Sequence, residues 1–245
     1  FQRNGNSVQA TIDDIERIMN RVDTIYVRDA DVTIQLTGIV VRSTSADPYT
    51  TSDAGQLLDQ FRNHWNQNFS GIRRDLAHLF TGRNVNGGTI GIAYLGVVCS
   101  QTVGYGLSES RFTNNLVNRT GLTAHEMGHN FNSNHCDGNG DCRIMCSGLG
   151  GCNNDVSRFG TASANGIRNY AISRGCLLDL SPPLALPVVD EFPVTQLNRD
   201  IWISFQGTEI TNAAVNEPSA PFSIRLNALS NSTLKDDRLI SNKLL

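Results

Sequence analysis

Three histidines and a glutamate lie close together in the segment "HEMGHNFNSNH", residues 125–135. His125 and His129 are four positions apart, which on a helix places both imidazoles on one face, one turn apart. His135 follows six positions later. Catalytic zinc typically has three protein ligands and one open position, so the pattern predicts a zinc centre made by these three histidines. The alternative is a histidine-rich helix end that binds no metal.

Glu126 directly follows the first histidine, and at that position its carboxylate would face the open coordination site. There it can take a proton from the zinc-bound water and later pass it to a leaving amine. Zinc lowers the pKa of its bound water to about 7, which makes hydroxide available at neutral pH. The expected chemistry is therefore hydrolysis, with Glu126 as the catalytic base.

The third histidine requires a bend in the chain. A continuing helix would carry His135 away from the other two, so the chain must turn sharply near residue 132. Such a turn needs a residue with positive φ, which glycine adopts most easily and asparagine next. Because Asn132 occupies this position, we expect it to be left-handed and to return His135 to the metal.

The composition is that of an ordinary globular protein. The 245 residues are 39% hydrophobic and carry a net charge of −3. No stretch approaches the roughly 20 apolar residues that span a bilayer, so no membrane span is predicted. No basic run or basic and aromatic patch indicates a nucleic-acid partner. The oligomeric state is left open.

The even number of cysteines indicates disulfides and an oxidising compartment. The six are Cys99, Cys136, Cys142, Cys146, Cys152 and Cys176. The alternatives are unpaired thiols, or a second zinc site in the cluster, whose spacings of six, four and six do not match a zinc ribbon or finger. We expect disulfides and a secreted protein, whose signal sequence would have been removed before Phe1.

Helices and strands are expected to alternate, which favours an α/β layer with a mixed sheet. Apolar periodicity predicts helices over about 7–22, 52–69 and 162–174, with the second continuing through 72–80. A further helix, capped by Thr120 or Thr123, is expected to run to about Phe131. His64 and His78 fall in these helices, where packing or surface roles are expected. Alternation and β-branched residues predict strands within 24–42 and 89–97.

A proline-rich stretch over 180–193 changes the character of the chain. The strand-like segments "DIWISF" and "FSIRLNAL" follow it, separated by turn residues. About 50 residues are too few for a complete sandwich. We therefore expect a main domain over 1–179, a linker over 180–193, and the incomplete start of a β domain over 194–245.

The segment "HEMGHNFNSNH" resembles the long zinc motif of the metzincin metallopeptidases, His-Glu-x-x-His-x-x-Gly-x-x-His. "RIM", with Met145 ten residues past His135, resembles the methionine turn beneath the metal in that clan. "DAGQLLDQFRNH", "DLAHLFTGRNVNGGTIGIAYLGVVCS" and "LTAHEMGHNF" are similar to the reprolysin (adamalysin) branch and its bacterial-type relatives, in the same order. The resemblance covers about residues 7–178.

This resemblance implies an α/β (α+β) zincin fold: a mixed twisted sheet, an active-site helix and a small irregular C-terminal subdomain. The residues after 194 are weakly similar to laminin-G or jelly-roll modules. An extended protein or peptide substrate would lie along the sheet edge and against the segment after Met145. The implied substrate-binding residues are Gly91, Ile92, Ala93, Tyr94, Ser147 and Gly148.

The resemblance also implies a Cys99–Cys176 bridge, which leaves three possible pairings for the other four cysteines. Two residues depart from the branch pattern. Asn132 replaces a glycine, and Cys136 replaces the aspartate that usually follows the third histidine. Because no tyrosine follows Met145 closely, a tyrosine ligand to the metal is not implied.

The function implied is a secreted zinc-dependent endopeptidase. The alternative is an adhesion or binding module whose protease domain is inactive or processes only its own precursor. The presence of Glu126 argues against an inactive domain, which has no need of the base. Calcium is a weaker expectation, because the loop "CDGNGDC" offers only Asp137 and Asp141 as carboxylate ligands.

Overall fold

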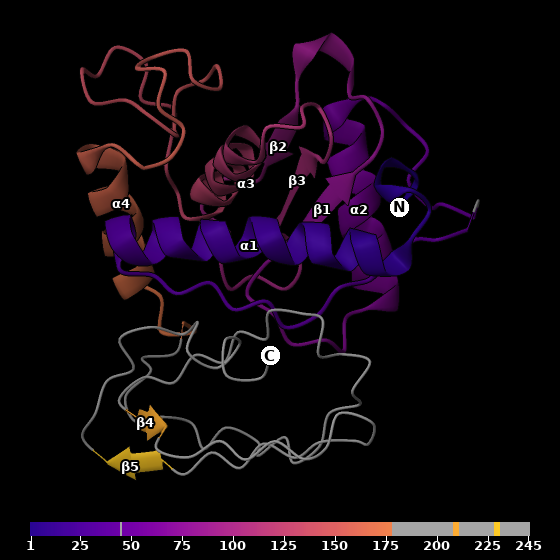
Figure 1. Cartoon of the computed structure of the whole chain (residues 1–245), viewed down its shortest axis with the longest axis horizontal. Coiled ribbons are helices and arrows are strands. Elements are labelled where there is room, and N and C mark those ends of the chain that lie inside the picture. Colours follow the sequence, from indigo (N-terminus) through magenta and orange to yellow (C-terminus); the bar gives the residue numbers. More distant parts are fainter. Residues whose placement is uncertain (45, 178–207, 211–227, 231–245) are drawn as a thin grey trace. The chain divides into compact units, whose positions relative to one another are not determined.

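The computed structural model describes residues 1–44 and 46–177, and the backbone of two strands beyond them (Figure 1). The chain divides into two units, Phe1–Leu177 and Leu178–Leu245. The first unit contains α1 Val8–Ala30, α2 Ala54–Asn68, β1 Ala77–Thr81, β2 Gly91–Ala93, β3 Tyr105–Glu109, α3 Leu116–Asn130, α4 Thr161–Ile172, and the short 3₁₀ helices Gln2–Asn4 and Asn86–Gly88. No helix among the described residues is long and apolar enough to cross a membrane.

The sheet of the first unit is mixed and has the strand order β1-β3-β2. β1 runs parallel to β3, with Leu79 opposite Leu107, and β2 runs antiparallel to β3, with Ile92 opposite Leu107. Since four α-helices accompany this sheet, the predicted mixed α+β fold class is confirmed.

Alternate side chains of the strands enter two separate cores. The core on the α2 side contains Tyr49, Leu57, Leu58, Phe61, Ala77, Val85, Tyr105 and Leu107. The core on the opposite face joins α1, α3 and α4, and includes Val22, Tyr26, Met127, Phe131, Met145, Phe159 and Ile167. In Figure 1, α1 passes alongside α3 and reaches α4. This second core holds α3, the helix of the histidine motif, against the sheet.

The first helix is longer than predicted. Ser7 caps it by accepting a hydrogen bond from Ala10 N, and it continues to Ala30, so the strand predicted from residue 24 is wrong. Ile25 and Tyr26 extend the buried helical stripe into the core, and this burial outweighs the β propensity of the segment. The described residues 32–42 form no strand.

The predicted helical continuation over 72–80 is also wrong, because α2 ends at Asn68 and Ala77–Thr81 is β1. A short apolar run fits a helix and a buried strand equally well, and pairing with β3 decides between them. His78 therefore lies in a strand, where its Nε2 is 2.8 Å from Ser108 Oγ. His64 lies in α2 as expected.

The helix of the histidine motif, α3, begins earlier than predicted. Asn115 caps α3 by accepting from Val117 N and Asn118 N, whereas Thr120 and Thr123 are buried inside the helix. The strand predicted over 89–97 is limited to Gly91–Ala93. The predicted linker and most of the predicted β segment lie outside the described residues. Within the predicted β segment, the described strand Thr208–Ile210 pairs antiparallel with Ala228–Ser230.

Candidate metal centre

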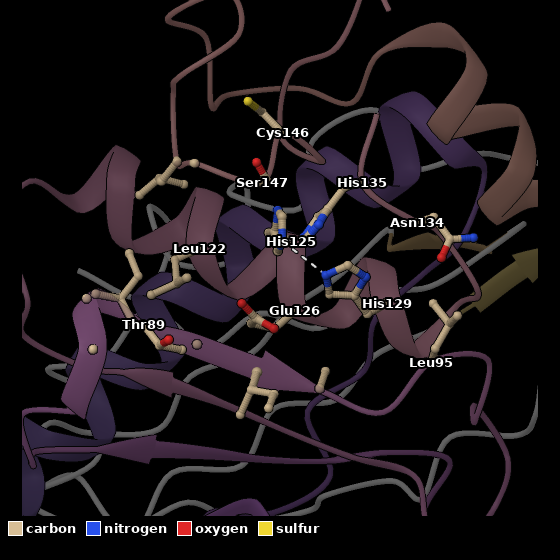
Figure 2. Close-up of a pocket in the computed structure, with 18 residues that line it drawn as sticks. Thr89, Leu95, Leu122, His125, Glu126, His129, Asn134, His135, Cys146 and Ser147 are labelled. Carbon is tan, nitrogen blue, oxygen red and sulfur yellow. Dashed lines mark hydrogen bonds between the residues drawn. The ribbon is translucent and has the colours of Figure 1, made fainter. Parts of the chain in front are cut away.

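The three histidines of the motif converge on one point. His125 and His129 project from successive turns of α3, and His135 returns from the following loop (Figure 2). Its Nε2 lies 3.2 Å from His125 Nε2, which is 3.1 Å from His129 Nε2. Nitrogen ligands around a tetrahedral zinc at about 2.0–2.1 Å are separated by about 3.3 Å. The donor atoms therefore fit a zinc ion.

Backbone carbonyls orient two of these rings. His125 Nδ1 lies 2.6 Å from Ile144 O, and His129 Nδ1 lies 2.7 Å from Ser133 O. When each Nδ1–H donates to its carbonyl, the lone pair of Nε2 points to the shared centre. Burial lowers the pKa of His125 to about 4 and also lowers the pKa of His129. Both rings are thus neutral at pH 7, as a metal ligand must be.

The turn to the third histidine has the predicted backbone. Asn132 has φ 64°, in the left-handed region. Its N–H donates to His129 O at 2.8 Å, and Ser133 N donates to Gly128 O at 2.9 Å. This turn places the Ser133 carbonyl against His129 and sends the chain back toward His135.

Replacing Asn132 with alanine should lower the free energy of unfolding by about 1 kcal/mol, because an alanine Cβ is disfavoured in the left-handed region. Replacing it with glycine should leave stability nearly unchanged. Urea unfolding and zinc affinity of the two variants measure the difference. Equal stability of the alanine and glycine variants would show that the left-handed turn is not required.

Met145 packs against α3 at Gly128 and is fully buried. A Cβ added to Gly128 would lie only 2.6 Å from Met145 Sδ, so the missing side chain makes room for the methionine. Gly128 did not emerge from the sequence pattern, although a glycine inside a predicted helix often marks such close packing.

Gly128→Ala should destabilise the protein by about 1–3 kcal/mol, since the added methyl group collides with Met145 in a packed core. Gly166 is the matched control, because it also lies inside a helix but a Cβ there meets open space. Gly166→Ala should instead stabilise by about 0.5–1 kcal/mol. Thermal unfolding measures both, and a loss of stability in the Gly166 variant alone would contradict this account.

Glu126 is buried beside the histidines and faces the sheet. Its side chain is 4% exposed and points from α3 toward β2, where a Cβ on Gly91 would collide with Oε1 (Figure 2). Burial raises the pKa of Glu126 to about 8. A buried carboxyl group with a pKa near neutrality, next to three converging imidazoles, is suited to carrying a proton.

A cleft of about 600 Å³ opens over these groups. It brings together the predicted residues Gly91, Ile92, Ala93, Ser147 and Gly148 with the histidines and Glu126, and adds Gly87, Gly88, Thr89, Ile90, Leu95, Leu122, Asn134, Cys146 and Leu149. Tyr94 is not among the described lining residues. Its side chain packs against the core on the α2 side, and its hydroxyl donates to Asp59 of α2 at 2.6 Å.

The outer edge of β2 faces this cleft. Ile90 O accepts from Glu109 N at 2.6 Å, and Tyr94 N donates to Tyr105 O at 3.2 Å. The backbone groups of Ile90 and Tyr94 are thus hydrogen-bonded to β3 and its flanking residues. By antiparallel alternation, Gly91 and Ala93 direct their N–H and C=O groups away from β3 and toward the cleft.

All six cysteines form disulfides, so neither free thiols nor a cysteine zinc site is present in residues 1–177. Cys99–Cys176 is the bridge that the resemblance implied. The others pair as Cys136–Cys142 and Cys146–Cys152, which selects one of the three possible connectivities. Both small loops flank Met145 in the chain.

The two acidic residues of the cysteine-rich loop bind different protein groups. Asp137 accepts from Ser147 N and Oγ, whereas Asp141 accepts from Thr161 N and Oγ1 at the start of α4. Calcium binding at this loop stays a prediction.

Comparison with known proteins places this geometry in a family. Residues 12–136 match the model of metallopeptidase family M12B, reprolysin-like. The human disintegrin and metalloproteinase domain-containing protein 9 is 30% identical over 190 residues, 73% of this chain and 22% of that protein. The human disintegrin and metalloproteinase domain-containing protein 19 is 33% identical over 160 residues, 62% of this chain and 16% of that protein. The mouse protein of the same name is 32% identical over 158 residues, 62% of this chain and 16% of that protein. The chain thus spans about a fifth of the length of the curated relatives it matches.

Proposed function

Because the chain belongs to the reprolysin-like M12B family of zinc metallopeptidases, we propose that it is itself a zinc-dependent endopeptidase. His125, His129 and His135 would hold the zinc ion, and Glu126 would act as general base and acid. The observation that carries the proposal is the convergence of three Nε2 atoms next to the buried carboxyl group of Glu126, at the floor of an open cleft.

Zinc bound to the three histidines would polarise the substrate carbonyl and acidify a water molecule. The chain itself supplies orientation and a proton carrier. The carbonyls of Ile144 and Ser133 hold the rings of His125 and His129 in the tautomer that binds metal. Met145 supports the helix from below.

Glu126 is the group that moves the proton. A nearby positive charge favours the ionised form of a carboxyl group, so Glu126 in the metal-loaded protein would accept a proton at neutral pH. It would then donate that proton to the amine that leaves. Burial against Gly91 of β2 fixes its carboxylate next to the strand along which the peptide would lie.

The substrate would be an extended peptide. Gly91 and Ala93 offer the backbone groups with which a peptide can pair as an added strand. Ser147 and Gly148 line the cleft and would contact the side chain that enters there. The three disulfides support secretion, because such bridges persist in oxidising compartments.

The test combines metal analysis with a quenched-fluorescence peptide library. We expect about one zinc per chain, cleavage that a chelator abolishes, and recovery when zinc is returned. His129→Ala should lose both zinc and cleavage. A zinc-loaded, folded protein that cleaves no peptide would refute the endopeptidase proposal and favour a binding module. Cleavage that survives complete metal removal would refute the metal-dependent mechanism.

A further inference from the structure

We propose that Asp137 is a positioning residue for substrate selectivity. Together with the Cys146–Cys152 disulfide, it fixes the segment Ser147–Leu149 and so determines which side chain the cleft accepts. We call this segment the cleft wall. The inference rests on the proposed function, because it concerns the peptide that would occupy the same cleft.

The cleft wall lacks intrinsic stiffness. It belongs to a five-residue loop between Cys146 and Cys152, and three of those five residues are glycines. Glycine loses more conformational freedom on folding than any other residue, so such a loop needs outside constraints to keep one shape. The Cys146–Cys152 bridge closes the loop, and Gly151 N donates to Gly148 O at 2.7 Å within it.

Asp137 provides a constraint from a different part of the chain. Its Oδ1 accepts from Ser147 Oγ at 2.8 Å, and its Oδ2 accepts from Ser147 N at 3.2 Å. Asp137 stands two positions after His135. These bonds therefore tie the first residue of the cleft wall to the loop that supplies the third histidine.

The cleft wall is held by other contacts than those that position His125 and Glu126. Ser147, Gly148 and Leu149 line the cleft together with Leu122 of α3. His125 and Glu126 are carried by α3, and the orientation of His125 depends on the Ile144 carbonyl, outside the wall. Loosening the wall should therefore change the fit of a substrate side chain more than it changes the positions of His125 and Glu126. The expected effect is on KM and selectivity, with kcat nearly preserved.

Asp141 offers a matched control on the same loop. Like Asp137, it is an aspartate that accepts from one backbone N–H and one hydroxyl, those of Thr161 at 2.8 and 2.9 Å. It also accepts from Arg143 Nε at 2.7 Å. Its partner Thr161 is the first residue of α4 and is not among the described residues that line the cleft. Asp137→Ala and Asp141→Ala each remove one carboxylate and its bonds to a backbone N–H and a hydroxyl. Asp141→Ala also removes the ion pair with Arg143, but only Asp137→Ala removes a contact to the cleft wall.

The experiment uses the zinc-loaded chain and a peptide series that varies the residue after the scissile bond. Asp137→Ala should raise KM about tenfold for the preferred peptide and reduce the preference ratio by a similar factor, which is the range that one changed pocket contact gives. We expect kcat to change less than about threefold and zinc content to stay the same. Asp137→Asn should recover part of the selectivity, because its amide oxygen still accepts.

Asp141→Ala should keep the wild-type preference ratio even where its unfolding temperature falls. If Asp137→Ala fails to fold, Asp137→Asn and Ser147→Ala test the same tie. Because Ser147 itself lines the cleft, its variant supports the tie only where its preference ratio falls together with that of Asp137→Asn, which leaves every lining side chain in place. Unchanged selectivity in both the Asp137 and Ser147 variants would overturn the inference while leaving the proposed peptidase intact. A loss of zinc or kcat at unchanged KM would also overturn it, because Asp137 would then support the metal. A wild-type chain that holds zinc but cleaves nothing would instead refute the proposed function, and this inference with it.

Discussion

Glu126→Gln should lower kcat for peptide cleavage by about 10³-fold while the zinc content stays unchanged. The amide has nearly the shape of the carboxylate, so it can occupy the buried space against Gly91. It cannot accept a proton, however, and general acid–base catalysis contributes about 10²–10⁴-fold. Because the substitution leaves the three histidines in place, KM should change little.

Glu109→Gln is the control for this variant. Glu109 is also a buried glutamate, but it lies in β3 and accepts from Val85 N at 3.1 Å. Its replacement should affect stability and leave kcat close to the wild-type value. Steady-state kinetics with a quenched peptide, together with metal analysis, measures both variants. A Glu126→Gln protein that retains a tenth or more of the wild-type kcat would rule out Glu126 as the proton carrier.

The sequence was most informative where the relevant contacts are local. The spacing of His125 and His129 places both rings on one helix face whatever the rest of the fold does. The positive φ of Asn132 likewise follows from the need to bring His135 back. Both features depend on about a dozen consecutive residues, so a single sequence contains the necessary evidence.

Features that depend on distant partners could not be predicted in the same way. The segments 24–30 and 77–81 were assigned to the wrong element because burial in a core and pairing with β3 decided their conformation. The disulfide pairing of the clustered cysteines needs distances that spacing does not supply.

Cys136 illustrates the same difficulty within the site. Cys136 stands where the branch pattern has an aspartate, so the sequence indicates that the carboxylate of that position is missing. In the structure Cys136 pairs with Cys142, and Asp137, one residue later, supplies a carboxylate that binds Ser147. The substitution at position 136 therefore did not reveal the contact made by residue 137, because the sequence does not show which residue of a turn reaches Ser147.

The largest effect on stability is expected at Asp14, which forms an ion pair with Arg119 between α1 and α3. The two side chains are 9% and 4% exposed, and Arg119 Nη1 and Nη2 donate to the two carboxylate oxygens at 2.8 and 2.5 Å. Asp14→Asn would leave the buried guanidinium without its counter-charge. Breaking such a pair by removing one partner costs about 3–5 kcal/mol.

The pH dependence gives this prediction a second measurement. Burial raises the pKa of Asp14, but the hydrogen bonds and charge of Arg119, with the charge of Arg111, outweigh it and hold the pKa below its ordinary value. A carboxyl group with a lowered folded-state pKa stabilises fully above its unfolded-state pKa of about 3.9, and this stabilisation is lost as the pH falls through the folded-state value. The difference in the free energy of unfolding between wild-type and Asp14→Asn proteins should therefore be full near pH 7, begin to shrink below about pH 4, and continue to shrink as the pH falls through the folded-state pKa.

Asp13→Asn is the control, because it removes the same charge from the neighbouring position. Asp13 accepts from Gln9 on the surface of α1, so its replacement should change the free energy of unfolding by less than about 0.5 kcal/mol. Urea unfolding in the presence of a chelator, from pH 7 to about pH 2, separates this effect from metal binding. A difference between wild type and Asp14→Asn that stays constant across that range would show that the Asp14–Arg119 charge pair is not its source, and that the variant acts through packing alone.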